Sequence, residues 1–135
     1  MKGAELMTER AVAPGRRTWA FAAGYLPDGS TGREPEFTSR DELCLLNTTE
    51  EEACATMTVY RDDADPMGPY EIRVPPRRVR HVRINDLMDP RPVPLGIPYG
   101  VTVKSDVPLV IQMRHLDTRQ AVLGVANLTG VTGAE

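Results

Sequence analysis

The sequence contains little cysteine, and this shortage excludes one class of protein. Only Cys44 and Cys54 occur in 135 residues, so the chain is no disulfide-rich secreted scaffold. Neither cysteine belongs to a C-x-x-C pattern and the two histidines are not spaced as ligands, so we expect no metal site and no cofactor. Two free thiols are the expectation. A disulfide stays conceivable if the acidic turn 48–52 closes a hairpin that places the two cysteines opposite each other.

Long apolar runs are also missing. The most compact apolar segment, residues 107–113, is far shorter than the roughly 20 residues that a membrane-spanning helix needs. The first residues interleave charged and apolar side chains and contain no apolar core of a signal peptide. We therefore expect a cytoplasmic protein.

Catalytic sequence motifs are absent as well. The chain has no nucleophile elbow, phosphate-binding loop, dinucleotide-binding glycine pattern or H-E-x-x-H zinc motif. Its serines are few and occur at positions predicted to be loops or strand edges. We therefore expect no enzymatic activity.

What the sequence does contain is alternation of apolar and polar residues, which predicts β-strands. One face of residues 53–60, for example, would carry Ala53, Ala55, Met57 and Val59. About eight short strands follow from this pattern, at 18–25, 42–47, 53–60, 70–74, 79–84, 100–105, 107–116 and 121–128. The prediction is an all-β, single-domain β-sandwich or jelly roll of antiparallel strands over residues 15–129. Residues 1–14 would be disordered or extended, and 130–135 a flexible tail.

One segment is ambiguous, and two loops are longer than hairpins need. Ser39 and Glu42 have the spacing of a helix capping box, whereas the following residues favour a strand that pairs with the next one. The loops, residues 26–40 and 85–99, have the length at which ordered loops are often functional, and four prolines stiffen the second.

A basic stretch covers positions 77–84, with four arginines and His81 in a chain of net charge −3. Its arginines are Arg77, Arg78, Arg80 and Arg83. Three interpretations stay open: ion pairs with the chain's own carboxylates, a rim for a protein partner or small polar ligand, and a nucleic-acid contact. The acidic remainder of the chain opposes the third, and no aromatic residue alternates with the arginines to stack on bases.

Two further groups are candidate binding residues. Trp19, the only tryptophan, is either a core anchor or a stacking platform for a sugar. In the second case, the polar side chains that would bind the sugar with it are Asn47, Asn85, Asp86 and Gln112. In residues 116–120, Asp117 and Arg119 would bond each other and organise a turn. Alternatively, Arg119 and Gln120 would face a ligand or a subunit.

Six pieces of sequence, at 15–27, 34–37, 44–47, 68–87, 106–112 and 116–121, resemble in order and spacing the family of small sensory rhodopsin transducers. The resemblance implies a jelly-roll β-sandwich, a cytoplasmic homotetramer and contact with the cytoplasmic face of a seven-helix photoreceptor. It also implies binding of small ligands, sugars in particular, and leaves DNA binding open. The matching polar and aromatic positions are Trp19, Tyr25, Glu36, Asn47, Tyr70, Arg83, Asn85, Asp86, Gln112, Asp117, Arg119 and Gln120.

The chain departs from the family pattern after Ala121 and in its first 14 residues. The leading hypothesis is a non-enzymatic signalling adaptor that docks a membrane photoreceptor or another partner. A carbohydrate-binding module comes second. A DNA-binding regulator that uses the basic stretch comes third.

Overall fold

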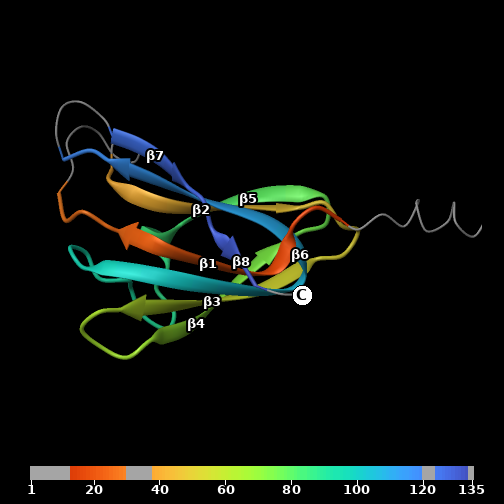
Figure 1. Cartoon of the computed structure of the whole chain (residues 1–135), viewed down its shortest axis with the longest axis horizontal. Coiled ribbons are helices and arrows are strands. Elements are labelled where there is room, and N and C mark those ends of the chain that lie inside the picture. Colours follow the sequence, from red (N-terminus) through yellow and green to blue (C-terminus); the bar gives the residue numbers. More distant parts are fainter. Residues whose placement is uncertain (1–12, 30–37, 120–123, 134–135) are drawn as a thin grey trace, which may run out of the picture.

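The computed structural model describes residues 13–29, 38–119 and 124–133 (Figure 1). They form eight β-strands and one turn of 3-10 helix. The elements are β1 (Arg16–Tyr25), β2 (Arg40–Asn47), β3 (Ala53–Arg61), β4 (Met67–Val74), β5 (Arg78–Arg83), η1 (Ile84–Asp86), β6 (Pro98–Asp117), β7 (Gly124–Leu128) and β8 (Val131–Thr132). Every strand pairing is antiparallel. The predicted all-β class is confirmed, and the arrangement is compatible with a jelly roll.

The strands form two layers that share β6. Sheet A has the order β4-β3-β6-β1-β8, and sheet B is made of β5, β2, β6 and β7. In Figure 1, β6 runs along the lower layer, bends at the right-hand end and returns in the upper layer. Its first half pairs with β1 and β3, and its second half pairs with β2 and β7.

The length of β6 differs from the prediction of two strands, 100–105 and 107–116. The chain stays extended where it changes layers, because other groups bond it there. The Asp106 carboxylate accepts the backbone N–H of Cys54 at 2.8 Å, and the Asp106 carbonyl oxygen accepts from the Arg17 side chain at 3.3 Å. Pro108 cannot donate to a strand ladder, and the β1 register shifts beside it, between Arg16 and Thr18.

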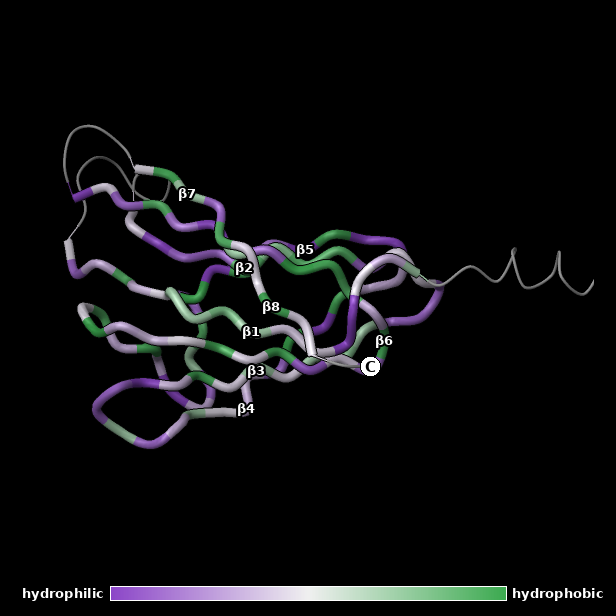
Figure 2. The backbone as a smooth tube through the Cα atoms, viewed as in Figure 1, coloured by the Kyte–Doolittle hydropathy of each residue, from purple (hydrophilic) through white to green (hydrophobic). Residues whose placement is uncertain are grey.

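The core fills the space between the layers. Both sheets contribute fully buried side chains to one cluster, among them Leu43, Leu45, Met57, Ile111 and Met113. The predicted alternation holds along β3, where Ala53, Ala55, Met57 and Val59 are all buried. Figure 2 shows hydrophobic and hydrophilic residues alternating along the strands, and a hydrophilic loop between β3 and β4.

The predicted hairpin between β2 and β3 is wrong, because the two strands belong to different sheets. Asn47 organises the crossing. Its buried side chain donates to the carbonyls of Glu51, Val74 and Pro75 and accepts from Thr49. Cys44 and Cys54 are consequently not opposite each other, and both thiols are free.

The ambiguous segment is a strand. Ser39 does not cap a helix, and β2 begins at the next residue. The described residues contain no helix that is long and apolar enough to cross a membrane.

The chain ends differ in part from the predicted boundaries. Val131 and Thr132, placed in the tail by the sequence analysis, pair with Ala20 and Trp19 of β1. Residues 1–12 and 134–135 lie outside the described residues.

Candidate functional site

One end of the molecule gathers the ends of four strands. Tyr25 at the end of β1 pairs with Pro98 at the start of β6, and Asp117 at the end of β6 pairs with Gly124 of β7. β2 begins beside them, with Arg40 paired to Leu116. We call this region, on the left in Figure 1, the loop end.

A buried carboxylate lies at the centre of the loop end. Asp41 has no exposed surface. One of its oxygens accepts from the backbone N–H of Tyr25 at 3.1 Å and from the hydroxyl of Tyr99. The other is 2.6 Å from Nδ1 of His115. Since an unpaired buried charge is costly, these three partners are what allow a carboxylate at this position.

Tyr99 is fixed both chemically and sterically. Burial raises the pKa of its phenol far above the ordinary value, and the charge of Asp41 and the hydrogen bond to it raise the pKa further. The hydroxyl therefore stays protonated and acts as a donor. Gly24 lies against the ring, because a Cβ added there would be 2.4 Å from the ring of Tyr99. A bulge after Phe21 brings Gly24, not Ala23, to the buried side of β1, contrary to strict alternation.

A second buried group ties the connecting segments together. The Ser39 hydroxyl donates to the carbonyl of Gly29 at 2.9 Å and accepts the backbone N–H of Thr118 at 2.8 Å. The Asn85 side chain donates to the carbonyl of Ser39 at 3.0 Å. In addition, the N–H of Gly96 donates to the carbonyl of Leu26 at 2.7 Å. These hydrogen bonds join four segments of the chain: the one before β2 and those after β1, β5 and β6.

Above this support lies a partly exposed cluster of Tyr25, Asp117 and Arg119. The predicted Asp117–Arg119 pair is present, and Arg119 donates to both carboxylate oxygens at 2.7 to 3.2 Å. These hydrogen bonds lower the pKa of Asp117. The Arg119 guanidinium carbon lies 5.8 Å from the centre of the Tyr25 ring, within cation–π range. With 47% of its side chain exposed, Arg119 remains accessible to a partner.

The structure does not gather the proposed sugar set around Trp19. The Trp19 indole N–H donates to the carbonyls of Arg16 and Leu109, both at 3.0 Å, and the ring stacks on Phe21. Asn47 makes the structural contacts described above, and Gln112 lies exposed in sheet B. Asp86, 3.9 Å from Arg83, lies beside Tyr70 and Met88 along a shallow groove.

The arginines of the basic stretch are divided among different contacts. Arg77 occupies a left-handed turn and forms an ion pair with Glu50 at 2.9 Å. Arg80 donates to the carbonyl of Arg73, and Arg78 to that of Arg77. Within the described chain, Arg78 and Arg80 have no carboxylate partner. Ion pairs with the chain's own carboxylates therefore involve only some of the arginines in this stretch.

The outer face of sheet B brings together residues that the sequence spacing had separated. Arg83 and Gln112 share this face with Glu42, Cys44 and His81, because directly paired residues of neighbouring strands point the same way. Glu42 forms ion pairs with Arg40 at 2.9 Å and Arg114 at 3.5 Å.

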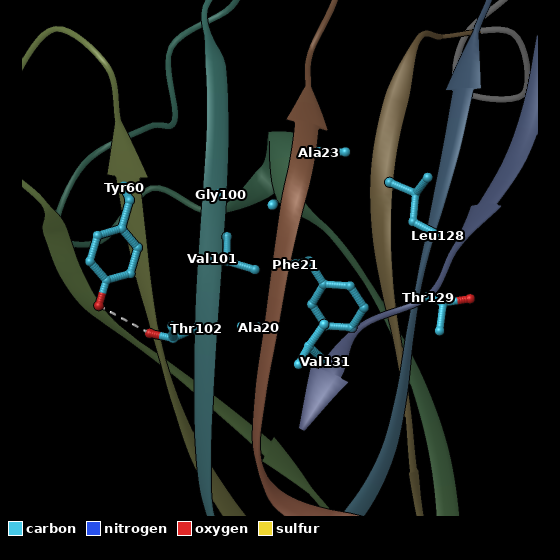
Figure 3. A pocket seen from close by; sticks show the side chains of 11 residues that line it. Ala20, Phe21, Ala23, Tyr60, Gly100, Val101, Thr102, Leu128, Thr129 and Val131 are labelled. Carbon is cyan, nitrogen blue, oxygen red and sulfur yellow. Dashed lines mark hydrogen bonds between the residues drawn. The ribbon is translucent and has the colours of Figure 1, made fainter. Parts of the chain in front are cut away.

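A groove of about 450 Å³ lies on the outer face of sheet A (Figure 3). β1, β3 and β6 form its floor, and residues from 128 to 131 form one wall. Its lining is mostly apolar and includes Phe21, Tyr60 and Val131. The Tyr60 side chain is half-exposed, and its hydroxyl is 3.4 Å from that of Thr102.

The sequence analysis missed Asp41, Tyr99 and His115. A signal was present for two of them. Asp41 has the strand parity of Leu43 and Leu45, and His115 has that of Met113, so both are polar residues at inward-facing positions. The predicted site residues Glu36 and Gln120 lie outside the described residues.

Comparisons with known proteins agree with this architecture. A search of curated proteins finds no match. Among solved structures, the Anabaena sensory rhodopsin transducer is 38% identical, with a TM-score of 0.66, over 76% of this chain and 99% of its own. The crystal structure of Thermotoga maritima 1070 is 29% identical, with a TM-score of 0.80, over 90% of this chain and 97% of its own. The family described as "Anabaena sensory rhodopsin transducer" matches residues 14–131. The chain belongs to the Anabaena sensory rhodopsin transducer family.

Proposed function

We propose that this protein is a non-enzymatic, cytoplasmic signalling adaptor that docks the cytoplasmic face of a sensory rhodopsin or a comparable membrane receptor through its loop end. Family membership supports the signalling role. The observation that carries the choice of surface is the partly exposed Tyr25–Asp117–Arg119 cluster, which lies on buried residues joined by hydrogen bonds.

The support matters because ordering a loop upon binding costs free energy. Here the described parts of these segments are already joined by Ser39 and Asn85, so binding of a partner would not have to order them. Arginine and tyrosine are also the residue types that most often dominate protein interfaces. Asp117 fixes the guanidinium of Arg119 while leaving about half of that side chain exposed.

Binding to a receptor in a lipid nanodisc tests this proposal. Anabaena sensory rhodopsin would be the receptor, measured in the dark and under illumination, with the Anabaena transducer as the positive control. We expect Arg119→Ala to weaken binding by about tenfold or more, as loss of a hot-spot residue does.

The matched control is Arg73→Ala. Arg73 is an exposed arginine that is also in an ion pair, with Glu52, but it lies next to Cys54 at the opposite end of the sheets. Equal losses in both variants would refute docking through the loop end. Failure of the wild-type protein to bind, while the Anabaena transducer binds, would refute the photoreceptor as partner.

The groove over sheet A favours a second candidate function, binding of a small ligand with an apolar face such as a sugar. Tyr60, not Trp19, would then be the aromatic platform, since it is the half-exposed aromatic side chain of the groove. Trp19 still serves as a reporter because it stacks on Phe21, which lines the groove. Sugars should change the Trp19 fluorescence, and Tyr60→Ala should abolish the change. A flat response over a broad sugar panel would contradict this candidate.

We further propose that the adaptor is a homotetramer, as the family resemblance implies. Exposed apolar side chains on both outer faces support assembly. They include Leu46 and Val79 on sheet B and Val131 on sheet A.

A further inference from the structure

Three potential metal ligands converge on the outer face of sheet B. Glu42 and Cys44 are two residues apart on β2 and therefore share a face. His81 on β5 is the direct ladder partner of Cys44. A carboxylate oxygen, the thiol sulfur and a ring nitrogen of these residues all lie within 4.8 Å of one another.

These ligand types suit one ion in particular. Zn²⁺ binds thiolate sulfur at about 2.3 Å and imidazole nitrogen or carboxylate oxygen at about 2.0 to 2.2 Å. Ligand atoms around a tetrahedral zinc are therefore roughly 3.5 Å apart, so modest side-chain rotations would close the cluster. One thiolate and one carboxylate would neutralise the charge of the ion.

The surroundings hold the carboxylate in place. Arg40 donates to one oxygen of Glu42 at 2.9 Å, and Arg114 lies 3.5 Å from the other. Carboxylates that ligate metals are commonly held by such outer contacts. Gln112, the β6 partner of Cys44, lies next to the cluster as a further polar group.

We propose that Glu42, Cys44 and His81 form a binding site for a single Zn²⁺ ion, which joins the edge strand β5 to β2. A water molecule would complete the tetrahedron, as in zinc sites with three protein ligands. The site lies on the outer face of sheet B and includes none of Tyr25, Asp117 and Arg119, the residues proposed for receptor docking.

Charged and polar side chains from β2, β5 and β6 surround the Cys44 thiol. Burial raises the pKa of the Cys44 thiol, Arg114 lowers it, and Glu42 raises it. The other groups facing the thiol are His81 and Arg83 from β5 and Gln112 from β6.

Cobalt provides a direct test, because Co²⁺ bound by a thiolate in a tetrahedral site has a sulfur-to-metal absorption band and strong visible bands. We would titrate untagged Cys54→Ser protein, in which Cys44 is the only thiol. We expect one equivalent of Co²⁺ to give these bands and Zn²⁺ to remove them. Mutating a residue that only contacts a metal ligand typically lowers metal affinity by roughly 10- to 100-fold. Cys44→Ala and His81→Ala remove ligands themselves and should each lower the affinity for Co²⁺ by more than that.

Alkylation of the wild-type protein gives a second measurement that depends on no substitution. Zn²⁺ should protect Cys44 from iodoacetamide and leave Cys54, the exposed cysteine on β3, reactive. Peptide mass spectrometry would resolve the two. Absence of the cobalt bands in folded Cys54→Ser protein, their persistence in Cys44→Ala, or equal alkylation of Cys44 with and without Zn²⁺ would each overturn the proposal.

Discussion

Asp41 and His115 are direct partners in the β2–β6 ladder, and the Asp41 carboxylate lies 2.6 Å from the His115 ring. Antiparallel pairing alone places these two side chains on the same face. Tyr99 reaches the same carboxylate from the opposite end of β6. One fully buried acid thus joins both ends of the longest strand, beneath the surface that we propose for docking.

Removing the Tyr99 hydroxyl should destabilise the protein. In Tyr99→Phe, Asp41 loses one of its donors while the ring that packs against Gly24 remains. A lost hydrogen bond to a charged group typically costs about 1.5 to 3 kcal/mol. Urea denaturation would measure the change. An unchanged midpoint would show that the Asp41 network does not support the fold.

The same residue predicts a loss of stability in alkaline solution. The folded-state pKa of Tyr99 is raised, so its contribution is complete below the ordinary value of 10.0 and is lost as the pH rises above it. The unfolded chain ionises there and the folded one does not. The free energy of unfolding should fall above this pH, and less steeply in Tyr99→Phe. Tyr70, whose pKa burial also raises, would account for part of the remaining slope.

Asn47→Ala should destabilise the protein by about 1 to 3 kcal/mol, since it leaves buried carbonyl groups without their donor. The carbonyls of Val74 and Pro75 both depend on this side chain. Thermal unfolding would measure the effect, with the exposed Asn127→Ala as control. Equal melting temperatures for the two variants would contradict the role of Asn47 in the crossing between the sheets.

Arg119→Ala should raise the pKa of Asp117 toward its ordinary value of 3.8. Because the folded-state pKa is lowered, the stabilising contribution of Asp117 is present above 3.8 and is lost as the pH falls below it. NMR titration of the Asp117 carboxyl carbon would follow the change directly. Arg73→Ala should leave this titration as it is in the wild type. If the Asp117 titration did not move in Arg119→Ala, the ion pair would be absent in solution.

Light scattering after size-exclusion chromatography should give the mass of a tetramer. Val131 is 72% exposed beside the groove, and we expect Val131→Asp to shift the protein toward smaller species because it introduces a charge on an apolar surface. Ala64→Asp, in the exposed loop between β3 and β4, provides the control. A wild-type monomer would refute the proposed assembly.

The strands could be predicted from the sequence because their pattern is local. Met57 and Val59 of β3, and Ile111 and Met113 of β6, are buried as the alternation requires. The alternation does not say which strands pair. The crossing at Asn47 depends on the carbonyls of residues 74 and 75, far along the chain, whereas the short acidic turn by itself predicts a hairpin.

The candidate site was predictable only in part. The Asp117–Arg119 pair joins residues two apart, so its geometry follows from local sequence. The Asp41 network and the cluster of Glu42, Cys44 and His81 instead combine residues from different strands. These residues are close together because of the register between paired strands, and this register cannot be predicted from residue spacing in the sequence.

The path of β6 has a mechanical consequence. Because β6 is one continuous strand that pairs in both layers, we do not expect one layer to unfold while the other stays folded. We therefore expect the protein to unfold in one cooperative step. We also expect a displacement of the loop end to be transmitted along β6 to Asp106, where the strand changes layers.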